Sequence, residues 1–543
     1  MKKRALISVY NKDGVLDLAS FLVKSGWEII STGGTSRYLS ENNIPVMDVS
    51  SVTNFPECLD GRVKTLHPAI HAGILAIRDQ KLHMDTLAEL NLETIDLVCV
   101  NLYPFFEKVK MAYMPAEVLN PALDEIIEYI DIGGPAMLRS AAKNFRDVIV
   151  ICDPADYADV IESIKDENIN HDLKKQLAGK VFNLTSAYDA AIARYLLETE
   201  SASTNKDPEF WPLSLLRSQS LRYGENNHQS AALYLHADKL GALGGMEQLH
   251  GKELGYNNIR DLDLAWKSAC AFGLSADGTT AMGEEEVLKF VPGGSSGNKV
   301  CCSAVKHNTP CGIALGDTLL EAYEKAYACD LASIFGGIIA VNTAVDVESA
   351  KKLGELFLEI IVAPEFDDEA LEILKKKKNL RIIKAQYAPR EIWEFIAVDG
   401  GMLVQSTDNK LLEKWECPTK LSPDEGDLKD LVFAYRAVSF VKSNAILLAK
   451  DLASTGIGGG QVNRLWPAQQ AIERSNAVLK DGNVRVLASD AFIPFPDVIE
   501  AAHAGGIKTI IQPGGSINDK AVIESCNNYE ISMIFTGLRH FKH

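Results

Sequence analysis

The sequence contains no apolar run that approaches the ~18 residues needed to cross a membrane. An apolar stretch follows the basic start of the chain, but Asn11, Lys12 and Asp13 end it too early for a secretory signal. Basic residues are in deficit, because 55 Lys and Arg face 73 Asp and Glu and leave a net charge of −18. We therefore expect no nucleic-acid partner and no membrane partner, whereas small anionic substrates need only local basic residues.

The ten cysteines lack the regular spacing of a disulfide framework. Several lie inside apolar runs, and the Cys301-Cys302 pair is one example. Reduced cysteines of this kind are typical of proteins outside oxidising compartments. The cysteine pattern therefore predicts a cytoplasmic protein.

The chain has an α/β pattern throughout. Short apolar runs predict buried strands, and stretches with helical periodicity lie between them. The strands are expected at residues 5–9, 27–31, 95–100 and 148–152, and the first helix at residues 15–25. Such alternation predicts a mostly parallel sheet with helices on both faces.

The length of 543 residues is too great for one hydrophobic core. The periodicity is interrupted near residues 200–214, which begin with a run of small and polar residues. We therefore predict a first domain at residues 1–199, with its core in about residues 1–150, and a second domain at residues 200–543.

A short apolar run in the second domain ends at Lys306 and His307. Zinc deaminases carry His-x-Glu and Pro-Cys-x-x-Cys, in which a histidine and two thiolates bind the metal. Here Cys311 follows a proline, but Ala314 replaces the second cysteine and Thr309 replaces the glutamate. We therefore expect no metal, and a Lys-His pair that transfers protons or stabilises negative charge.

Three clusters in the first domain suit an anion site. The loop at residues 31–35 follows a strand and opens a helix, although such Gly-Gly turns also occur without a ligand. Arg62 and Lys64 project to the same side of an extended segment, and a solvated basic face is the alternative. Residues 131–135 form a second Gly-rich entry to a helix, and Tyr103 follows a buried strand, where ligands gather in α/β sheets.

His67 and His71 have the i, i+4 spacing of a metal-binding pair. No glutamate follows His67 as it does in metalloprotease helices, and Pro68 argues against an unbroken helix there. We interpret both histidines as structural or packing residues.

Nine short motifs give the chain a resemblance to one enzyme family, the bifunctional AICAR formyltransferase/IMP cyclohydrolases of purine biosynthesis (AICAR is aminoimidazole-carboxamide ribonucleotide and IMP inosine monophosphate). The first domain contributes STGGT at 31–35, DGRVKTLHP at 60–68, NLYPF at 101–105 and DIGGPAMLRSAAKN at 131–144. The second contributes LRYGENNHQ at 221–229, KHNTPCG at 306–312, SDAFIPFPD at 489–497, QPGGS at 512–516 and LRHF at 538–541. The motifs stand in the family's order along nearly the whole chain.

The resemblance implies the fold and the chemistry. It implies a methylglyoxal-synthase-like, doubly wound parallel sheet in the first domain and a larger, cytidine-deaminase-like α/β formyltransferase region in the second. The formyl group of 10-formyltetrahydrofolate, a co-substrate, passes to the amine of AICAR, and formyl-AICAR then closes to IMP with loss of water. The resemblance implies no tightly bound cofactor, and it implies a homodimer with formyltransferase sites at the subunit interface.

The resemblance also assigns residues to the two sites. The catalytic positions of the cyclohydrolase are Lys64, Tyr103, Asp131 and Lys143, and its substrate-binding positions are Lys12, Ser31, Gly33, Gly34, Thr35, Arg62 and Thr65. For formyl transfer, His307 is the base, Lys306 stabilises charge or protonates the leaving group, and Asn444 orients the chemistry. AICAR is held by Arg222, Tyr223, Gly336, Glu359, Phe492 and Arg539, and Asp497 is associated with folate.

The chain departs from the family pattern at Asn227, which replaces a proline, and at Pro496, which replaces an arginine. The first change is expected to affect a loop and the second the folate contacts. Two other readings are a zinc deaminase and a non-enzymatic nucleotide sensor, since the two folds resemble those classes as well. The missing metal ligands disfavour the first reading, and the retained proton-transfer groups disfavour the second.

Overall fold

A computed structural model of the chain describes residues 2–56, 58–59, 62–112, 123–166, 170–197, 208–238, 241–273, 280–291, 297–479 and 486–543. The chain forms two compact units, Met1–Leu216 with His236–Leu240 and Arg217–Leu235 with Gly241–His543. The boundary expected between residues 199 and 200 lies outside the described residues. Within the described ranges, no helix combines the length and the apolar character needed to span a membrane.

The first unit is built on a five-stranded sheet in the order β3-β2-β1-β4-β5. Its strands are β1 (Arg4–Val9), β2 (Glu28–Ser31), β3 (Met47–Asp48), β4 (Leu97–Asn101) and β5 (Ile149–Ile151). Every pairing in this sheet is parallel, as the sequence predicts. The carboxyl ends of β1, β2 and β4 therefore lie at one edge of the sheet.

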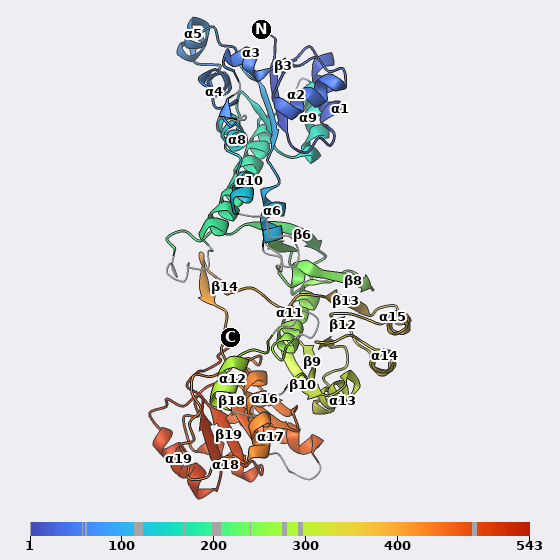
Figure 1. Cartoon of the computed structure of the whole chain (residues 1–543), viewed down its shortest axis with the longest axis vertical. Coiled ribbons are helices and arrows are strands. Elements are labelled where there is room, and N and C mark those ends of the chain that lie inside the picture. The colour runs from blue at the N-terminus through green and yellow to red at the C-terminus, as the bar shows by residue number, and fades with distance from the viewer. Residues whose placement is uncertain are drawn as a thin grey trace. The chain divides into compact units, whose positions relative to one another are not determined.

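Helices cover both faces of this sheet (Figure 1). They are α1 (Val15–Lys24), α2 (Gly33–Glu41), α3 (Val49–Thr53), α4 (Pro68–Leu75), α5 (Lys81–Glu89), α6 (Phe105–Ala112), α7 (Leu123–Ile127), α8 (Gly133–Lys143), α9 (Tyr157–Lys165) and α10 (His171–Leu197). α1 packs with α9, and α8 packs with α4 and α10. The apolar stripe of α1, which includes Val15, Leu18 and Leu22, is fully buried in the core, as its helical spacing predicts.

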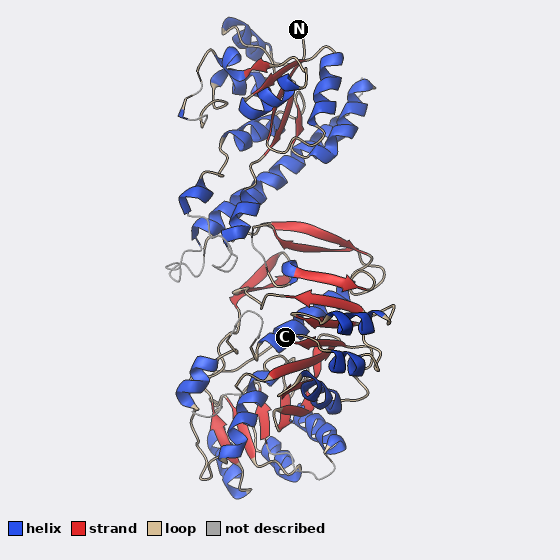
Figure 2. Ribbon diagram, turned by 45° about the vertical axis from the view of Figure 1, so that its right-hand side comes forward, coloured by secondary structure: helices blue, strands red, loops and turns tan. Residues whose placement is uncertain are grey.

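The second unit contains an eleven-stranded sheet in the order β20-β19-β18-β16-β17-β10-β9-β11-β12-β13-β8. Its strands are β8 (Met246–His250), β9 (Val300–Lys306), β10 (Thr309–Gly316), β11 (Ile338–Val341), β12 (Ile360–Ala363), β13 (Arg381–Ala385), β16 (Ile446–Lys450), β17 (Ala453–Gly458), β18 (Val486–Ser489), β19 (Thr509–Gln512) and β20 (Ser532–Phe535). Two short ribbons stand apart from it (Figure 2), β6 (Leu215–Leu221) with β7 (Ala231–His236) and β14 (Trp393–Val398) with β15 (Gly401–Ser406).

This larger sheet is mixed, which departs from the mostly parallel arrangement that the alternation predicts. β9 pairs antiparallel with β10, and β16 pairs antiparallel with β17. Each pair is joined by a loop of only two residues, His307-Asn308 and Asp451-Leu452. Two residues can close a hairpin but are too few for a parallel crossover, so these connections determine the direction of the strands.

Alternate residues of the strands enter cores on opposite faces. In β9, Cys301 and Val305 pack beneath α11 (Tyr256–Cys270) and α16 (Leu428–Val438), whereas Cys302 and Ala304 pack on the other face. The pair Cys301-Cys302 is therefore buried strand core, as predicted. The other helices of this unit are α12 (Glu284–Phe290), α13 (Leu319–Cys329), α14 (Val347–Leu353), α15 (Asp368–Lys375), α17 (Leu465–Val478), α18 (Asp497–Ala504) and α19 (Asp519–Asn528).

Candidate active sites

A cavity of about 520 Å³ opens at the carboxyl ends of β1 and β4 in the first unit. α2 and α8 both begin beside this cavity, so two helix N-termini are directed at it. The first N–H groups of α2 favour an anion such as a phosphate, whereas the Gly134 N–H at the start of α8 already donates to the Asp131 carboxylate. The predicted site residues that line the cavity are Lys12, Gly34, Thr35, Arg62, Lys64, Thr65, Tyr103 and Asp131.

The hydroxyl groups of the 31–35 loop have separate roles. Thr35 Oγ1 donates to the Val9 carbonyl at 2.9 Å and accepts from Lys12 Nζ at 3.2 Å. This contact holds the Lys12 ammonium beside the cavity, where partial burial lowers its pKa. Ser31 is fully buried and donates to the Ile7 carbonyl at 2.7 Å, so its hydroxyl serves the sheet and does not line the cavity.

Asp131 lies where the chain enters α8. Its carboxylate accepts from the Gly134 N–H at 2.9 Å, and its own N–H donates to the Tyr188 hydroxyl at 2.8 Å. Burial raises the pKa of Asp131, and the Lys64 ammonium acts in the opposite direction. A side chain on Gly134 would collide with this carboxylate, and a Cβ on Gly133 would lie 2.6 Å from Thr65 Oγ1. The Gly-Gly sequence thus permits the helix to approach the cavity closely.

Tyr103 follows β4 and faces Tyr10 with an edge-to-face ring contact of 5.7 Å. Burial, and then the negative charge of Asp131, raise the pKa of Tyr103. The phenol therefore stays protonated at neutral pH and can donate to an oxygen of a ligand. Asn101, which is not among the predicted site residues, also lines this cavity, and its Oδ1 accepts from the Tyr10 N–H at 2.5 Å.

The basic residues of this site differ in their environment. Lys64 lies against the helix entry, since a Cβ on Gly33 would be 3.1 Å from its Nζ. Arg62 is exposed and forms an ion pair with Glu128, which also lines the cavity. Lys143 is exposed at the far end of α8 and does not line the cavity. The structure of one chain therefore does not bring Lys143 to the other predicted residues.

The two histidines near this site have structural contacts. His67 caps α4 by accepting from the Ala69 N–H at 3.1 Å, and Pro68 is the first residue of that helix. His71 lies 3.0 Å from Ser140 Oγ in α8, and burial lowers its pKa. No group of three His, Cys, Asp or Glu side chains among the described residues is placed to bind a metal ion.

The predicted formyltransferase residues other than Arg222 and Tyr223 lie at one edge of the large sheet. β9 ends there at Lys306, and β11 begins there because Ile338 pairs with Val305. β16 also begins at this edge, where Ile446 pairs with Ser489 at the end of β18. Along this edge, in strand order, lie the residues just after β18, those just before β16, those just after β9, and those just before β11 and β12.

Lys306 is at the end of a strand, as the apolar run before it predicts, and His307 occupies the adjoining turn. Lys306 Nζ donates to the Phe335 carbonyl at 2.6 Å, and a Cβ on Gly336 would lie 4.0 Å from it. Glu359 lies before β12 and is paired with Arg381 at 2.6 Å. Lys306, His307, Gly336 and Glu359 thus occupy neighbouring strand ends.

Arg222 and Tyr223 follow β6 on an exposed loop, with the guanidinium 5.8 Å from the phenol ring centre. The loop is closed by Gln229, which accepts from the Asn226 N–H at 2.8 Å, and it is tied to α11 by an ion pair between Glu225 and Arg260 at 2.9 Å. Asn227 is an exposed residue of this closed loop. The loop keeps these contacts with asparagine at the position where the family pattern has proline.

A second cavity, of about 500 Å³, lies at the same sheet edge beside the start of β16. Asn444, Phe492 and Asp497 line it together with Arg464, whereas Lys306 and His307 do not. Pro496 lies at the entrance to α18, directly before Asp497. Arg539 does not line this cavity, but its guanidinium lies 4.9 Å from the ring of Phe541, which does.

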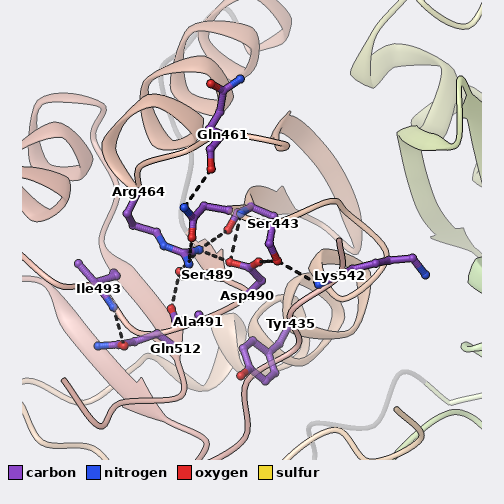
Figure 3. Close-up of polar contacts among 12 residues, drawn as sticks. Tyr435, Ser443, Gln461, Arg464, Ser489, Asp490, Ala491, Ile493, Gln512 and Lys542 are labelled. Carbon is purple, nitrogen blue, oxygen red and sulfur yellow. Dashed lines mark hydrogen bonds and ion pairs between the residues drawn. The ribbon is translucent and has the colours of Figure 1, made fainter. Parts of the chain in front are cut away.

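Arg464 and Asp490 are buried partners behind this cavity (Figure 3). Arg464 donates to Asn444 Oδ1 at 2.6 Å, while Asn444 Nδ2 donates to the Gln461 carbonyl at 2.9 Å. Asp490 is fully buried and also accepts from Ser443 Oγ and from the Ala445 N–H. Arg464, which follows a Gly-rich turn, is not among the predicted site residues, and Asp490 belongs to the motif at residues 489–497.

Replacing Asp490 by asparagine should destabilise the second unit by about 3–5 kcal/mol, because the Arg464 guanidinium would be left buried without its carboxylate. Urea unfolding measures the change. Glu372→Gln, which removes an exposed partner of Lys375, should stay within ~1 kcal/mol of the parent. A loss no larger than that of the control would mean that the buried pair contributes nothing to stability.

Cys311 lies in β10 with its thiol directed to the Ala304 carbonyl at 3.5 Å. Burial raises the pKa of this thiol to about 12. A metal ligand has to be a thiolate, so this environment is the opposite of one that prepares a cysteine for zinc.

Comparison with known proteins identifies the class that these two sites define. A profile of the AICARFT/IMPCHase bienzyme family matches residues 141–474, and a profile of the MGS-like domain matches residues 14–136. The chain is 53% identical to the bifunctional purine biosynthesis protein PurH of Clostridium acetobutylicum and 54% identical to that of Fusobacterium nucleatum, in each case over all of both chains. The crystal structure of ForH matches 36% of this chain and all of its own, at 34% identity and a TM-score of 0.32.

The chain belongs to the AICARFT/IMPCHase bienzyme family. It is an enzyme of purine biosynthesis with two activities, AICAR formyltransferase and IMP cyclohydrolase. The family expected from the short motifs is thereby confirmed, as is the combination of an MGS-like first domain with an α/β formyltransferase region.

Proposed function

We propose that the cavity of the first unit closes the purine ring and that the edge of the large sheet transfers the formyl group. The observation that carries this division is the 520 Å³ cavity, which all the predicted cyclohydrolase residues line except Ser31, Gly33 and Lys143. None of the predicted formyltransferase residues lies in that cavity. Two reactions with different polar requirements would thus use two separate sets of side chains.

In the first cavity, the N-terminus of α2, together with Lys12 and Arg62, binds the ribose phosphate. Ring closure is intramolecular: the carboxamide nitrogen attacks the formyl carbon, and the formyl oxygen leaves as water. Holding the two groups together lowers the entropic barrier. Tyr103 donates to the formyl oxygen, the Lys64 ammonium stabilises its developing charge, and Asp131 accepts a proton from the nitrogen.

In the second unit, the amine of AICAR attacks the formyl carbon of 10-formyltetrahydrofolate. This amine is a poor nucleophile because its lone pair is delocalised, so His307 removes its proton during the attack. Lys306 stabilises the oxyanion or protonates the departing folate nitrogen. Asn444, Phe492 and Asp497 line the neighbouring cavity, where AICAR and the folate bind. We propose that folate is a co-substrate and that neither reaction needs a tightly bound cofactor.

Within a single chain, the two parts of this second site lie apart from each other. β10 and β17 lie between β9, which carries Lys306, and β16, which follows Asn444. Three strand spacings amount to about 14 Å. A homodimer would bring a second copy of each part to the interface. The β14–β15 ribbon supports this proposal, because it exposes Ile396, Val398 and Leu403.

The joint assay tests the division of labour. Purified protein incubated with AICAR and 10-formyltetrahydrofolate should yield formyl-AICAR and then IMP, and supplied formyl-AICAR should yield IMP without folate. A protein that consumed AICAR only by releasing ammonia would instead be a deaminase. A protein that bound the nucleotide and changed neither substrate would be a sensor.

Replacing Arg62 by alanine should mainly raise KM for formyl-AICAR. A charge-assisted contact to the phosphate contributes ~1.5–3 kcal/mol, which corresponds to about tenfold to hundredfold in KM. The effect should fall toward the lower value, because Arg62 is exposed and has to break its ion pair with Glu128 before it can bind the phosphate. Steady-state kinetics at two ionic strengths measure it. A wild-type KM would place the phosphate elsewhere in the cavity.

A further inference from the structure

The turn that carries His307 has an uncommon backbone. His307 and Asn308 form the whole loop between β9 and β10, and both have φ of 54°. A two-residue hairpin loop with two positive φ values is the type I′ pattern, in which Asn-Gly is preferred. Only glycine adopts this left-handed region freely, because the Cβ of any other residue, histidine included, crowds the following carbonyl. The turn therefore needs support from outside the hairpin.

Asp261 of α11 supplies that support. Its Oδ2 accepts from the His307 N–H at 3.1 Å, and its Oδ1 accepts from the Asn308 N–H at 2.5 Å. A carboxylate has two acceptor oxygens for two N–H groups, whereas an amide has only one. α11 is itself firmly placed, because Leu262 and Trp266 are buried beneath it against the sheet.

The same arrangement recurs at the other two-residue hairpin of this sheet. Asp451 and Leu452 join β16 to β17 with φ of 52° and 58°. Their N–H groups donate to Asp430 of α16 at 2.9 and 2.6 Å. This second turn lies at the opposite edge of the sheet from Lys306 and Asn444 and carries no proposed catalytic residue. It is thus an internal comparison for the first.

We propose that Asp261 is a positioning residue for formyl transfer, which holds the His307 turn in its left-handed conformation and so aims the imidazole at the substrate amine. This proposal rests on the proposed role of His307 as the base. Asp261 need not touch the substrate, since it acts through the backbone of the turn. A proton acceptor that is displaced by about 1 Å can lose on the order of a hundredfold in rate.

Asp261→Asn is the direct test, with Asp430→Asn as the matched control. Asp261→Asn should lower kcat for formyl transfer by about tenfold to a hundredfold, with little change in KM for AICAR. Asp430→Asn should lower the melting temperature about as much as Asp261→Asn does, but it should leave kcat at the value of the parent enzyme. Equal losses of kcat in both variants, or a wild-type kcat in Asp261→Asn, would overturn the proposal.

A second substitution isolates the backbone effect. Glycine adopts a positive φ freely, so Asn308→Gly should make the turn self-supporting, and Asp261→Asn/Asn308→Gly should recover most of the lost kcat. This double variant also tests the proposal if Asp261→Asn alone does not fold. A folded double variant without recovery would show that Asp261 acts in another way. His307→Ala with undiminished formyl transfer would instead refute the proposed function, whatever Asp261 does.

Discussion

His307→Ala should abolish formyl transfer, with kcat lower by about 10²–10⁴-fold, and leave the cyclisation of supplied formyl-AICAR nearly intact. The amine of AICAR cannot attack efficiently while it keeps its proton, and a methyl group cannot accept that proton. Cyclisation should survive because the 520 Å³ cavity belongs to the first unit and His307 to the second. Separate assays with the two substrates measure both rates on one preparation.

The control for this variant is His503→Ala. His503 is exposed and stacks on Tyr529 at 4.3 Å, away from the sheet edge that carries the proposed site. It should leave both rates unchanged. If His307→Ala destroyed cyclisation in a folded protein, the assignment of two separate sites would be wrong.

Lys64→Ala should lower kcat for cyclisation by about 10²–10³-fold, with a smaller change in KM. The reason is that the Lys64 ammonium lies beside the entry to α2 and lines the cavity. In the proposed mechanism it stabilises the charge that develops on the formyl oxygen. Binding of the phosphate would still rest on Lys12, Arg62 and the N-terminus of α2. Lys24→Ala, at the exposed end of α1, is a matched loss of one lysine and should have no effect.

The same variant should change the pH dependence of cyclisation. Burial raises the pKa of Asp131, and Lys64 partly offsets this shift. An acid is charged above its pKa, so activity that needs the carboxylate is present above that pKa and is lost as the pH falls through it. Without Lys64 the pKa of Asp131 should rise further, and the acidic limb should move to higher pH. An unmoved limb, with kcat at the wild-type value, would mean that the basic residues are only a solvated face.

Lys143 needs a separate explanation. The resemblance assigns it a catalytic role, yet it lies at the opposite end of α8 from Gly133 and Gly134, which line the cavity. A helix rises about 1.5 Å per residue, so ten residues amount to about 15 Å. Helical spacing in the sequence therefore could not decide whether this lysine reaches the ligand. Its role in catalysis remains a prediction.

Local sequence determined the elements of the first unit and the family of the chain. The apolar runs at residues 5–9 and 27–31 became β1 and β2, because a short, wholly buried run has few alternatives to a central parallel strand. The strand before Lys306 was predicted on the same ground. The 31–35 loop and Tyr103 also pointed to one site, since residues that follow parallel strands meet at one edge.

Only the tertiary structure decided which neighbours those residues have. No local pattern shows that Glu128 pairs with Arg62, that Arg464 holds Asn444, or that Asp261 supports His307, because each contact joins segments far apart in the chain. The same holds for the mixed direction of the large sheet, which two-residue hairpins impose. Spacing in a sequence conveys which residues share a face of one element, whereas burial and long-range hydrogen bonds depend on how the elements pack.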